Sequence, residues 1–224
     1  MINLFVITSV INISNGPFTY TDIRSLYTCE ERFEQTKQTI QTIKEKVPNV
    51  KILHVECSNI NSEQQNYIIN NVDYFINLYD DEYIRNIIDG KSKSMGENTL
   101  LLNAINYIKF HDIEYDNFYK ISGRYFLNDQ FNYDNYNNDK LIYSDTKTGC
   151  DYDIHTSLYK IPKSYVTKYY KYIIDNINSL EDGFCAELFY GLFLKNHVDS
   201  EYKIKVDKLG VSGKVAVFNH YANF

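Results

Sequence analysis

Short apolar runs alternate with helical segments along the first half of this chain, and that order limits the folds it can adopt. Strands are predicted at Asn3–Thr8, Val50–Glu56 and Asp73–Tyr79. Between the first two lies an amphipathic helix, which starts at the T-x-x-E capping box of Thr28 and Glu31 and ends at Pro48. Such βαβ units predict a largely parallel sheet covered by helices.

The remaining elements suggest a mixed second half. A capping-box pattern at Ser62 and Gln65 predicts another short helix, and a fourth strand lies in "FYKISGRYFLND", residues 118–129. The other expected segments are a helix at Gly96–Phe110, strands at Lys140–Asp145 and His155–Ile161, a helix from Pro162, a helix over Asp182–Asn196 and a short strand at Gly213–Phe218. The fold class expected is α/β, with a mixed, mostly parallel central sheet flanked by helices in a single Rossmann-like domain spanning residues 1–224.

Composition excludes several classes of protein. The chain has 224 residues, of which 44% are hydrophobic and 23% charged, as in globular domains. Its formal net charge of −6 argues against general nucleic-acid binding and against docking on an anionic membrane. The apolar run at residues 1–13 lacks a basic leader and is too short to span a bilayer. The four cysteines form no C-x-x-C pair, which fits reduced thiols and a cytoplasmic protein.

The exit of the fourth strand is the strongest candidate for a binding site. Ligands of open α/β sheets bind beyond the carboxyl ends of the strands. Lys120, Ser122 and Arg124 would share one face of the strand, and Gly123 permits close approach of the backbone, so together they suggest an anion site. The alternative is that Arg124 pairs with Asp129 or Asp116 at the sheet edge.

Three segments, taken in order, resemble a known family. "EERFEQTKQTIQTIKEKVPN", "GENTLLLNAINYI" and "YKISGRYFL" are similar to small glycosyltransferases of bacterial polysaccharide loci and large DNA viruses. That resemblance implies the GT-A fold and a nucleotide-sugar donor, with UDP as the commonest carrier. It spans most of the chain, and "SGRY" is its sharpest part.

The resemblance also raises the question of whether a divalent metal ion binds at this strand exit. GT-A enzymes usually end this strand in Asp-x-Asp, which holds a divalent ion against the sugar diphosphate, whereas this chain has Ser122-Gly123-Arg124. Either Lys120 and Arg124 neutralise the diphosphate without metal, or Mn or Mg is held elsewhere. The carboxylates that could then serve are Asp151 with Asp153, or Asp80 with Asp81, and the family often places a histidine such as His220 near metal or diphosphate.

Other site residues follow from position. The family's nucleoside rests at the exit of the first strand, here Thr8 and Ser9. Arg24 and Arg32 could reach a phosphate, or form exposed pairs with Glu30 and Glu31.

An inverting transfer also needs a carboxylate base. The x-E-D motif of the family matches Leu180-Glu181-Asp182 at the expected start of a late helix, which favours Asp182, with Glu187 in reserve. Acidic residues are also common at any helix N-terminus, so this pattern is not specific to a base.

These observations predict a glycosyltransferase that moves a sugar from a nucleotide sugar to a hydroxyl of a glycan or glycoprotein acceptor. One alternative is a sugar nucleotidyltransferase, although the glycine-rich stretch expected after the first strand is missing from "TSVINISNGP". The other is a non-catalytic nucleotide- or carbohydrate-binding module, which would bind UDP and consume no UDP-sugar.

Overall fold

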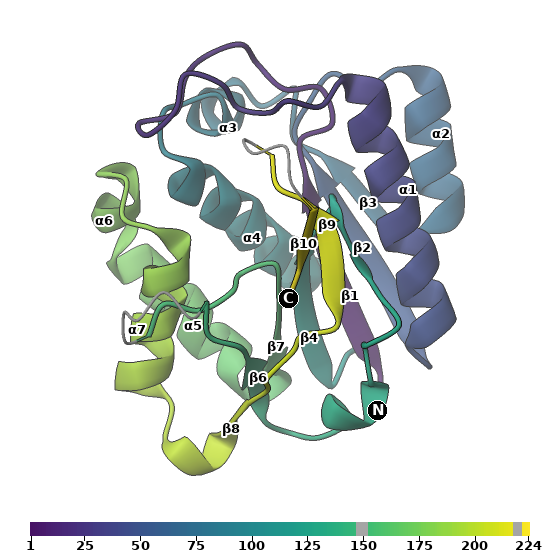
Figure 1. Ribbon diagram of the computed structural model, residues 1–224. Coiled ribbons are helices and arrows are strands. Elements are labelled where there is room, and N and C mark those ends of the chain that lie inside the picture. Colours follow the sequence, from purple (N-terminus) through teal and green to yellow (C-terminus); the bar gives the residue numbers. More distant parts are fainter. Residues whose placement is uncertain (147–151, 217–220) are drawn as a thin grey trace.

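The computed structural model describes residues 1–146, 152–216 and 221–224. A seven-stranded sheet runs through the molecule in the order β3-β2-β1-β4-β7-β6-β8 (Figure 1). Its strands are β1 (Asn3–Ser9), β2 (Val50–Glu56), β3 (Tyr74–Asn77), β4 (Asn117–Ser122), β6 (Leu141–Tyr143), β7 (Leu158–Pro162) and β8 (Lys203–Lys205). β1 to β4 are mutually parallel where they pair, and β7 then runs antiparallel to both β4 and β6. The predicted mixed, mostly parallel sheet is confirmed.

A second sheet of three strands, in the order β10-β9-β5, lies against one face of the first (Figure 1). It consists of β5 (Tyr125–Leu127), β9 (Val211–Lys214) and β10 (Tyr221–Asn223), all antiparallel. The "FYKISGRYFLND" segment therefore contributes to both sheets. β4 ends at Ser122, Gly123 and Arg124 form a turn, and β5 begins at Tyr125.

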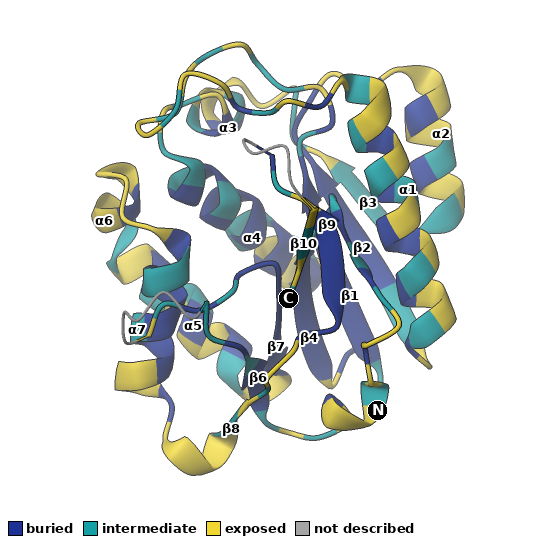
Figure 2. Ribbon diagram, in the orientation of Figure 1, coloured by how far each residue is buried: buried dark blue, intermediate teal, exposed yellow. Residues whose placement is uncertain are grey.

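Helices cover both faces of the large sheet, and their buried sides face it (Figure 2). Side chains alternate along β1, so that Leu4 and Val6 pack toward α4, α5 and α7 while Phe5 and Ile7 pack toward α1 and the small sheet. The helices are α1 (Cys29–Lys46), α2 (Ser62–Asn71), α3 (Glu82–Ile88), α4 (Lys93–Phe110), α5 (Lys163–Asp175), α6 (Ile177–Glu181) and α7 (Ala186–His197). Within the described ranges, no helix is long and apolar enough to cross a bilayer.

The observed N-termini of α1 and α2 can be compared with the predicted capping boxes. The Thr28–Glu31 capping box of α1 is confirmed, with both of its hydrogen bonds formed. The box of α2 lies one residue earlier than predicted, at Asn61 and Gln64, because asparagine is an equally good cap.

The late helix predicted over Asp182–Asn196 is wrong at its start. Asp182 closes α6, Gly183 turns the chain with a φ of +89°, and α7 begins only at Ala186. Asp182 is therefore not at a helix N-terminus.

Candidate functional site

A cavity opens at the carboxyl ends of β1 and β4, where the sequence predicted a ligand site. Its lining residues surround about 1020 Å³ of space between protein atoms, a volume that includes open solvent at the mouth. The loop at residues 10–28 lies beyond these strand ends (Figure 1), and Phe18, Tyr20 and Arg24 of this loop line the cavity. Predicted residues that line it are Thr8, Ser9, Arg24, Arg32, Ser122, Gly123 and Arg124, and they are joined by Thr36, Phe18, Tyr20, Lys93, Glu97 and Asp89 among others.

Gly123 fixes the exit of β4 at the cavity wall. Its N–H donates to the Thr8 carbonyl at 2.9 Å, and its own carbonyl accepts from Thr36 Oγ1 at 2.9 Å. A Cβ at this position would stand 2.9 Å from Ser9 Cβ, closer than packed carbons approach. Glycine is therefore required here for close packing against β1 and α1.

Arg124 follows at once and is half-buried in the cavity wall. Its Nε is buried without a hydrogen-bond partner among the described residues, and its guanidinium lies 5.1 Å from the centre of the Tyr125 ring. Burial pushes the pKa of Arg124 down, but Tyr125 and the Glu97 carboxylate push it up, and the net shift is upward. Arg124 is therefore a permanent cation with donor capacity to spare.

The alternative prediction for Arg124, an ion pair with Asp129 or Asp116 at the sheet edge, is wrong. Asp129 pairs instead with Lys46 at 3.3 Å, and Asp116 accepts a hydrogen bond from the Ile2 N–H at 2.6 Å.

Arg32 places a second guanidinium in the same wall. Its Nε and Nη2 donate to the Val10 carbonyl at 2.9 and 2.7 Å, which ties α1 to the loop after β1. Burial, and then the charge of Arg124, lower the pKa of Arg32 to about 10, while Glu56 opposes the shift. The like charges of the two arginines therefore disfavour each other, and an anion bound near both would relieve that repulsion.

Arg24 acts differently, because its side chain binds backbone carbonyls and so holds the loop at residues 10–28 in place. Its Nε donates to the Gly16 carbonyl at 2.7 Å and its Nη1 to the Ile88 carbonyl at 2.9 Å, while Nη2 donates to the carbonyls of Asp89 and Gly90. Four of its five N–H bonds are thus used by backbone. Arg24 lines the cavity, but only one donor remains for a phosphate.

The arginines of the cavity form no ion pair with any described carboxylate. Across the ranges that the structure describes, Arg24, Arg32 and Arg124 have no carboxylate oxygen within 4.0 Å. The suggested exposed pairs with Glu30 and Glu31 are therefore not formed. The cavity carries a surplus of positive charge although the whole chain is acidic.

Lys120 does not face the cavity as predicted. Its side chain is fully buried, and its ammonium donates to Glu97 Oε1, to Ser122 Oγ at 3.2 Å and to the Thr156 carbonyl at 3.2 Å. An ammonium has three N–H bonds, and all three are occupied. The strand alternation placed it correctly on one face with Ser122, but that face is packed beneath α4.

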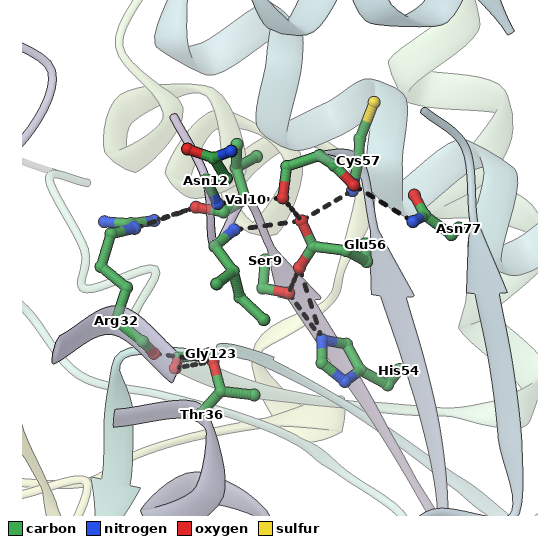
Figure 3. Close-up of polar contacts among 12 residues, drawn as sticks. Ser9, Val10, Asn12, Arg32, Thr36, His54, Glu56, Cys57, Asn77 and Gly123 are labelled. Carbon is green, nitrogen blue, oxygen red and sulfur yellow. Dashed lines mark hydrogen bonds and ion pairs between the residues drawn. The ribbon is translucent and has the colours of Figure 1, made fainter. Parts of the chain in front are cut away.

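A buried polar network lies under Ser9 (Figure 3). Ser9 Oγ donates to Glu56 Oε2 and stands 2.5 Å from His54 Nε2. The hydroxyl has one proton, so His54 must carry its own proton on Nε2 and donate it to Ser9. Burial lowers the pKa of His54 to about 3, which keeps the ring neutral.

The other oxygen of Glu56 joins two loops. Oε1 accepts from the Ile11 N–H at 3.0 Å, the Cys57 N–H at 3.1 Å and Ser58 Oγ at 2.6 Å (Figure 3). Burial raises the pKa of Glu56, and the hydrogen bonds from Ser58 and Ser9 partly offset that shift. The network holds the loop after β1 against the loop after β2, and so fixes one end of the cavity.

Both candidate bases lie outside the cavity lining. Asp182 is exposed on the turn between α6 and α7, where a Cβ on Gly183 would stand 3.8 Å from Thr19 Oγ1, on the loop over the cavity. Glu187 accepts from Thr156 Oγ1 at 3.1 Å and from the Cys185 thiol at 2.9 Å.

Only some of the predicted metal ligands lie in the described part of the chain. Asp81 caps α3 through the Ile84 N–H, and Asp153 accepts from Thr146 Oγ1 at 2.7 Å, while Asp151 and His220 lie outside the described residues. No group of three histidine, cysteine or carboxylate side chains that could hold a metal ion occurs in the described part of the chain.

The sequence analysis did not predict the part of the cavity wall that α4 forms. Lys93, Gly96, Glu97 and Leu100 line the cavity at three- and four-residue steps, a helical periodicity that was readable in the sequence. It was overlooked because the same helix also carries a longer apolar stripe against the sheet.

Neither a protein-family model nor a curated protein sequence matches the chain. A solved structure described as a glycosyltransferase involved in the glycosylation of the major capsid of PBCV-1 matches it with a TM-score of 0.49 and 10% sequence identity. The match covers 92% of this chain and 82% of the other. At that identity, residue roles do not transfer.

Proposed function

We propose that this protein is a glycosyltransferase of the GT-A type that binds a nucleotide-diphosphate sugar in the cavity. The observation that carries the proposal is the pairing of opposite chemistries at the exit of β4: the unpaired guanidinium of Arg124 and the carboxylate of Glu97 line the same cavity. A simple polyanion would suit the arginines and be repelled by Glu97. A nucleotide sugar offers negative charge to the arginines and hydroxyl groups to Glu97.

The diphosphate would lie against Arg124 and Arg32, with Lys93 nearby on α4. The repulsion between the two arginines supports this assignment, since an anion between them would be stabilised by both. The same cations would stabilise the charge that develops on the leaving nucleotide when the glycosidic bond breaks.

The nucleoside would lie at the exit of β1. Thr8, Ser9 and the backbone after them line that end, and Phe18 and Tyr20 from the loop above supply aromatic surface for a base. We assign UDP as the carrier, on the family resemblance of the sequence.

In the transfer, the bond from the anomeric carbon to the diphosphate oxygen breaks, and its electron pair leaves with the nucleotide. The acceptor hydroxyl, on a glycan or glycoprotein, forms the new bond and passes its proton to a carboxylate. We propose an inverting reaction with Asp182 as this base, because the turn that carries it lies near the loop at residues 10–28: a Cβ on Gly183 would stand 3.8 Å from Thr19 Oγ1. Glu187 is the alternative.

We propose that the reaction proceeds without a resident metal. We also propose that the protein is cytoplasmic. The surplus of guanidinium charge supports the first proposal, since arginines can supply the electrostatic stabilisation that Mn or Mg supplies elsewhere. Assays with and without Mn²⁺ decide it.

A non-catalytic binding module is the second candidate, because neither Asp182 nor Glu187 lines the cavity. The test is release of UDP from UDP-glucose, UDP-galactose and UDP-N-acetylglucosamine, measured by NMR with mixed oligosaccharide acceptors. UDP release that Arg124→Ala abolishes supports the transferase. Binding of UDP without any release favours the module, and absence of both contradicts the proposal.

A further inference from the structure

A buried ion pair forms part of the cavity floor. Lys120 on β4 is fully buried, whereas the side chain of its partner Glu97 on α4 keeps 17% of its surface exposed. Glu97 lines the cavity and Lys120 does not. The pair therefore presents only its negative member to a ligand.

Lys120 holds that carboxylate in one position. Its three N–H bonds go to Glu97 Oε1, Ser122 Oγ and the Thr156 carbonyl, so that the ammonium is anchored to β4 and to the segment before β7. A carboxylate bound to an anchored cation has little freedom to swing away, and its geometry is set before any ligand arrives.

The second oxygen of Glu97 is left open. Only Oε1 is engaged, and no described residue donates a hydrogen bond to Oε2. Burial would raise the pKa of Glu97, but the charge of Lys120, and then that of Lys93, lower it, and the net shift is downward. Glu97 is therefore an ionised carboxylate with a free acceptor oxygen in a cavity whose other charges are mainly positive.

A free acceptor oxygen needs a donor on the ligand. Phosphate oxygens carry no protons to give and would be repelled, whereas sugar hydroxyls donate readily. Arg124 and Glu97 line the same cavity, so a ligand that engages both has an anionic group and hydroxyl groups within one molecule.

We propose that Glu97 is the residue that orients the donor sugar, by accepting hydrogen bonds from its hydroxyl groups. Lys120 is its positioning residue and touches no substrate. This assignment rests on the proposed function, because it takes the ligand to be a nucleotide sugar. It makes Glu97 a determinant of which sugar is accepted, since epimers present their hydroxyls in different directions.

The test compares dissociation constants by calorimetry for UDP, UDP-glucose, UDP-galactose and UDP-N-acetylglucosamine. Glu97→Gln keeps the size of the side chain and removes the charge. Glu34→Gln is the matched control, since Glu34 is also paired with a lysine, Lys37 at 2.6 Å, but on the exposed surface of α1. The readout is the ratio between the weakest and the tightest UDP-sugar.

In the wild type and in Glu34→Gln, we expect this ratio to be about tenfold or more, the size of one hydrogen bond to a charged group. In Glu97→Gln it should fall to within about threefold of unity, while UDP alone binds as well as before or better. A purely structural ion pair would lower the melting temperature and leave the ratio unchanged.

Two outcomes overturn the inference. Either Glu97→Gln keeps the wild-type ratio, or the wild type binds UDP and fails to distinguish the sugars. Both leave the proposed function intact, because UDP still binds. Absence of binding by UDP and by all three UDP-sugars would instead contradict the proposed function itself.

Discussion

Gly123 packs against Ser9 so closely that the two residues leave no room for a side chain between β4 and β1. A Cβ on Gly123 would stand 2.9 Å from Ser9 Cβ and 3.2 Å from Thr36 Oγ1. Arg124 is the next residue, so this contact decides where its guanidinium enters the cavity. Ser9 is held in turn by His54 and Glu56. The position of the cation is thus set by buried packing rather than by a flexible loop.

Gly123→Ala should therefore destabilise the protein and weaken ligand binding together. Overpacking of a buried contact costs about 1–3 kcal/mol in the free energy of unfolding, measured by urea denaturation. Gly16→Ala is the control, since a Cβ there would meet its nearest neighbour, the Asp89 carbonyl, at an ordinary 3.7 Å. Equal stabilities for the two variants would show that the close approach at Gly123 is not a constraint.

Arg124 should dominate the affinity for the diphosphate. Loss of one or two charge-assisted hydrogen bonds predicts that Arg124→Ala weakens UDP binding by about 10- to 100-fold in calorimetry. Arg124→Lys should recover only part of this loss, because an ammonium keeps the charge and lacks the planar fork. Arg85→Ala removes an arginine outside the cavity lining, where it donates to the Tyr79 carbonyl at 2.8 Å, and should leave UDP affinity within about twofold. Unchanged affinity in Arg124→Ala would remove Arg124 from the site.

His54 should make the fold sensitive to mild acid. Its pKa is lowered from 6.5 to about 3 by burial, so between these values the unfolded chain binds a proton that the folded chain refuses. Stability therefore falls as pH falls below 6.5, by about 2 kcal/mol between pH 6.5 and about pH 5. His54→Gln can still donate to Ser9 but cannot titrate.

The measurement for His54 is urea denaturation of the wild type and His54→Gln at both pH values. Glu56, the acidic group 3.8 Å from His54 Nε2, is present in both proteins, so the difference isolates the histidine. We expect the variant to lose about 2 kcal/mol less than the wild type over this interval. Parallel losses would mean that His54 takes up as many protons in the folded chain as in the unfolded chain over this interval, so that burial does not lower its pKa.

The sequence predicted the scaffold well because its signals are local. The apolar runs that became β1, β2 and β3, and the capping box at Thr28, depend on neighbours within one turn or one strand. The sequence analysis predicted β4 and β5 as one strand, because no local feature of the sequence indicates that Phe126 belongs to the second sheet. Its partner, Ser212 on β9, lies far along the chain.

The site was harder to predict because it depends on distant pairings. Arg124 was identified from its place after a strand, but the partner of Lys120 is Glu97, which lies on another element. Ser9 was identified for the same reason as Arg124, whereas Glu56 and His54 were read only as parts of a strand. Their role arises from the register that aligns Ser9 with Glu56.

The most direct test of the account is a calorimetric titration of the wild-type protein with UDP, repeated with GDP, CMP and dTDP, in EDTA and then with Mn²⁺. We predict that UDP binds tightest and that EDTA changes its dissociation constant by less than about threefold, because arginines rather than a resident metal hold the diphosphate. Binding that requires Mn²⁺ would contradict the metal-free site. Failure of all four nucleotides to bind under either condition would contradict the central claim that this cavity holds a nucleotide diphosphate.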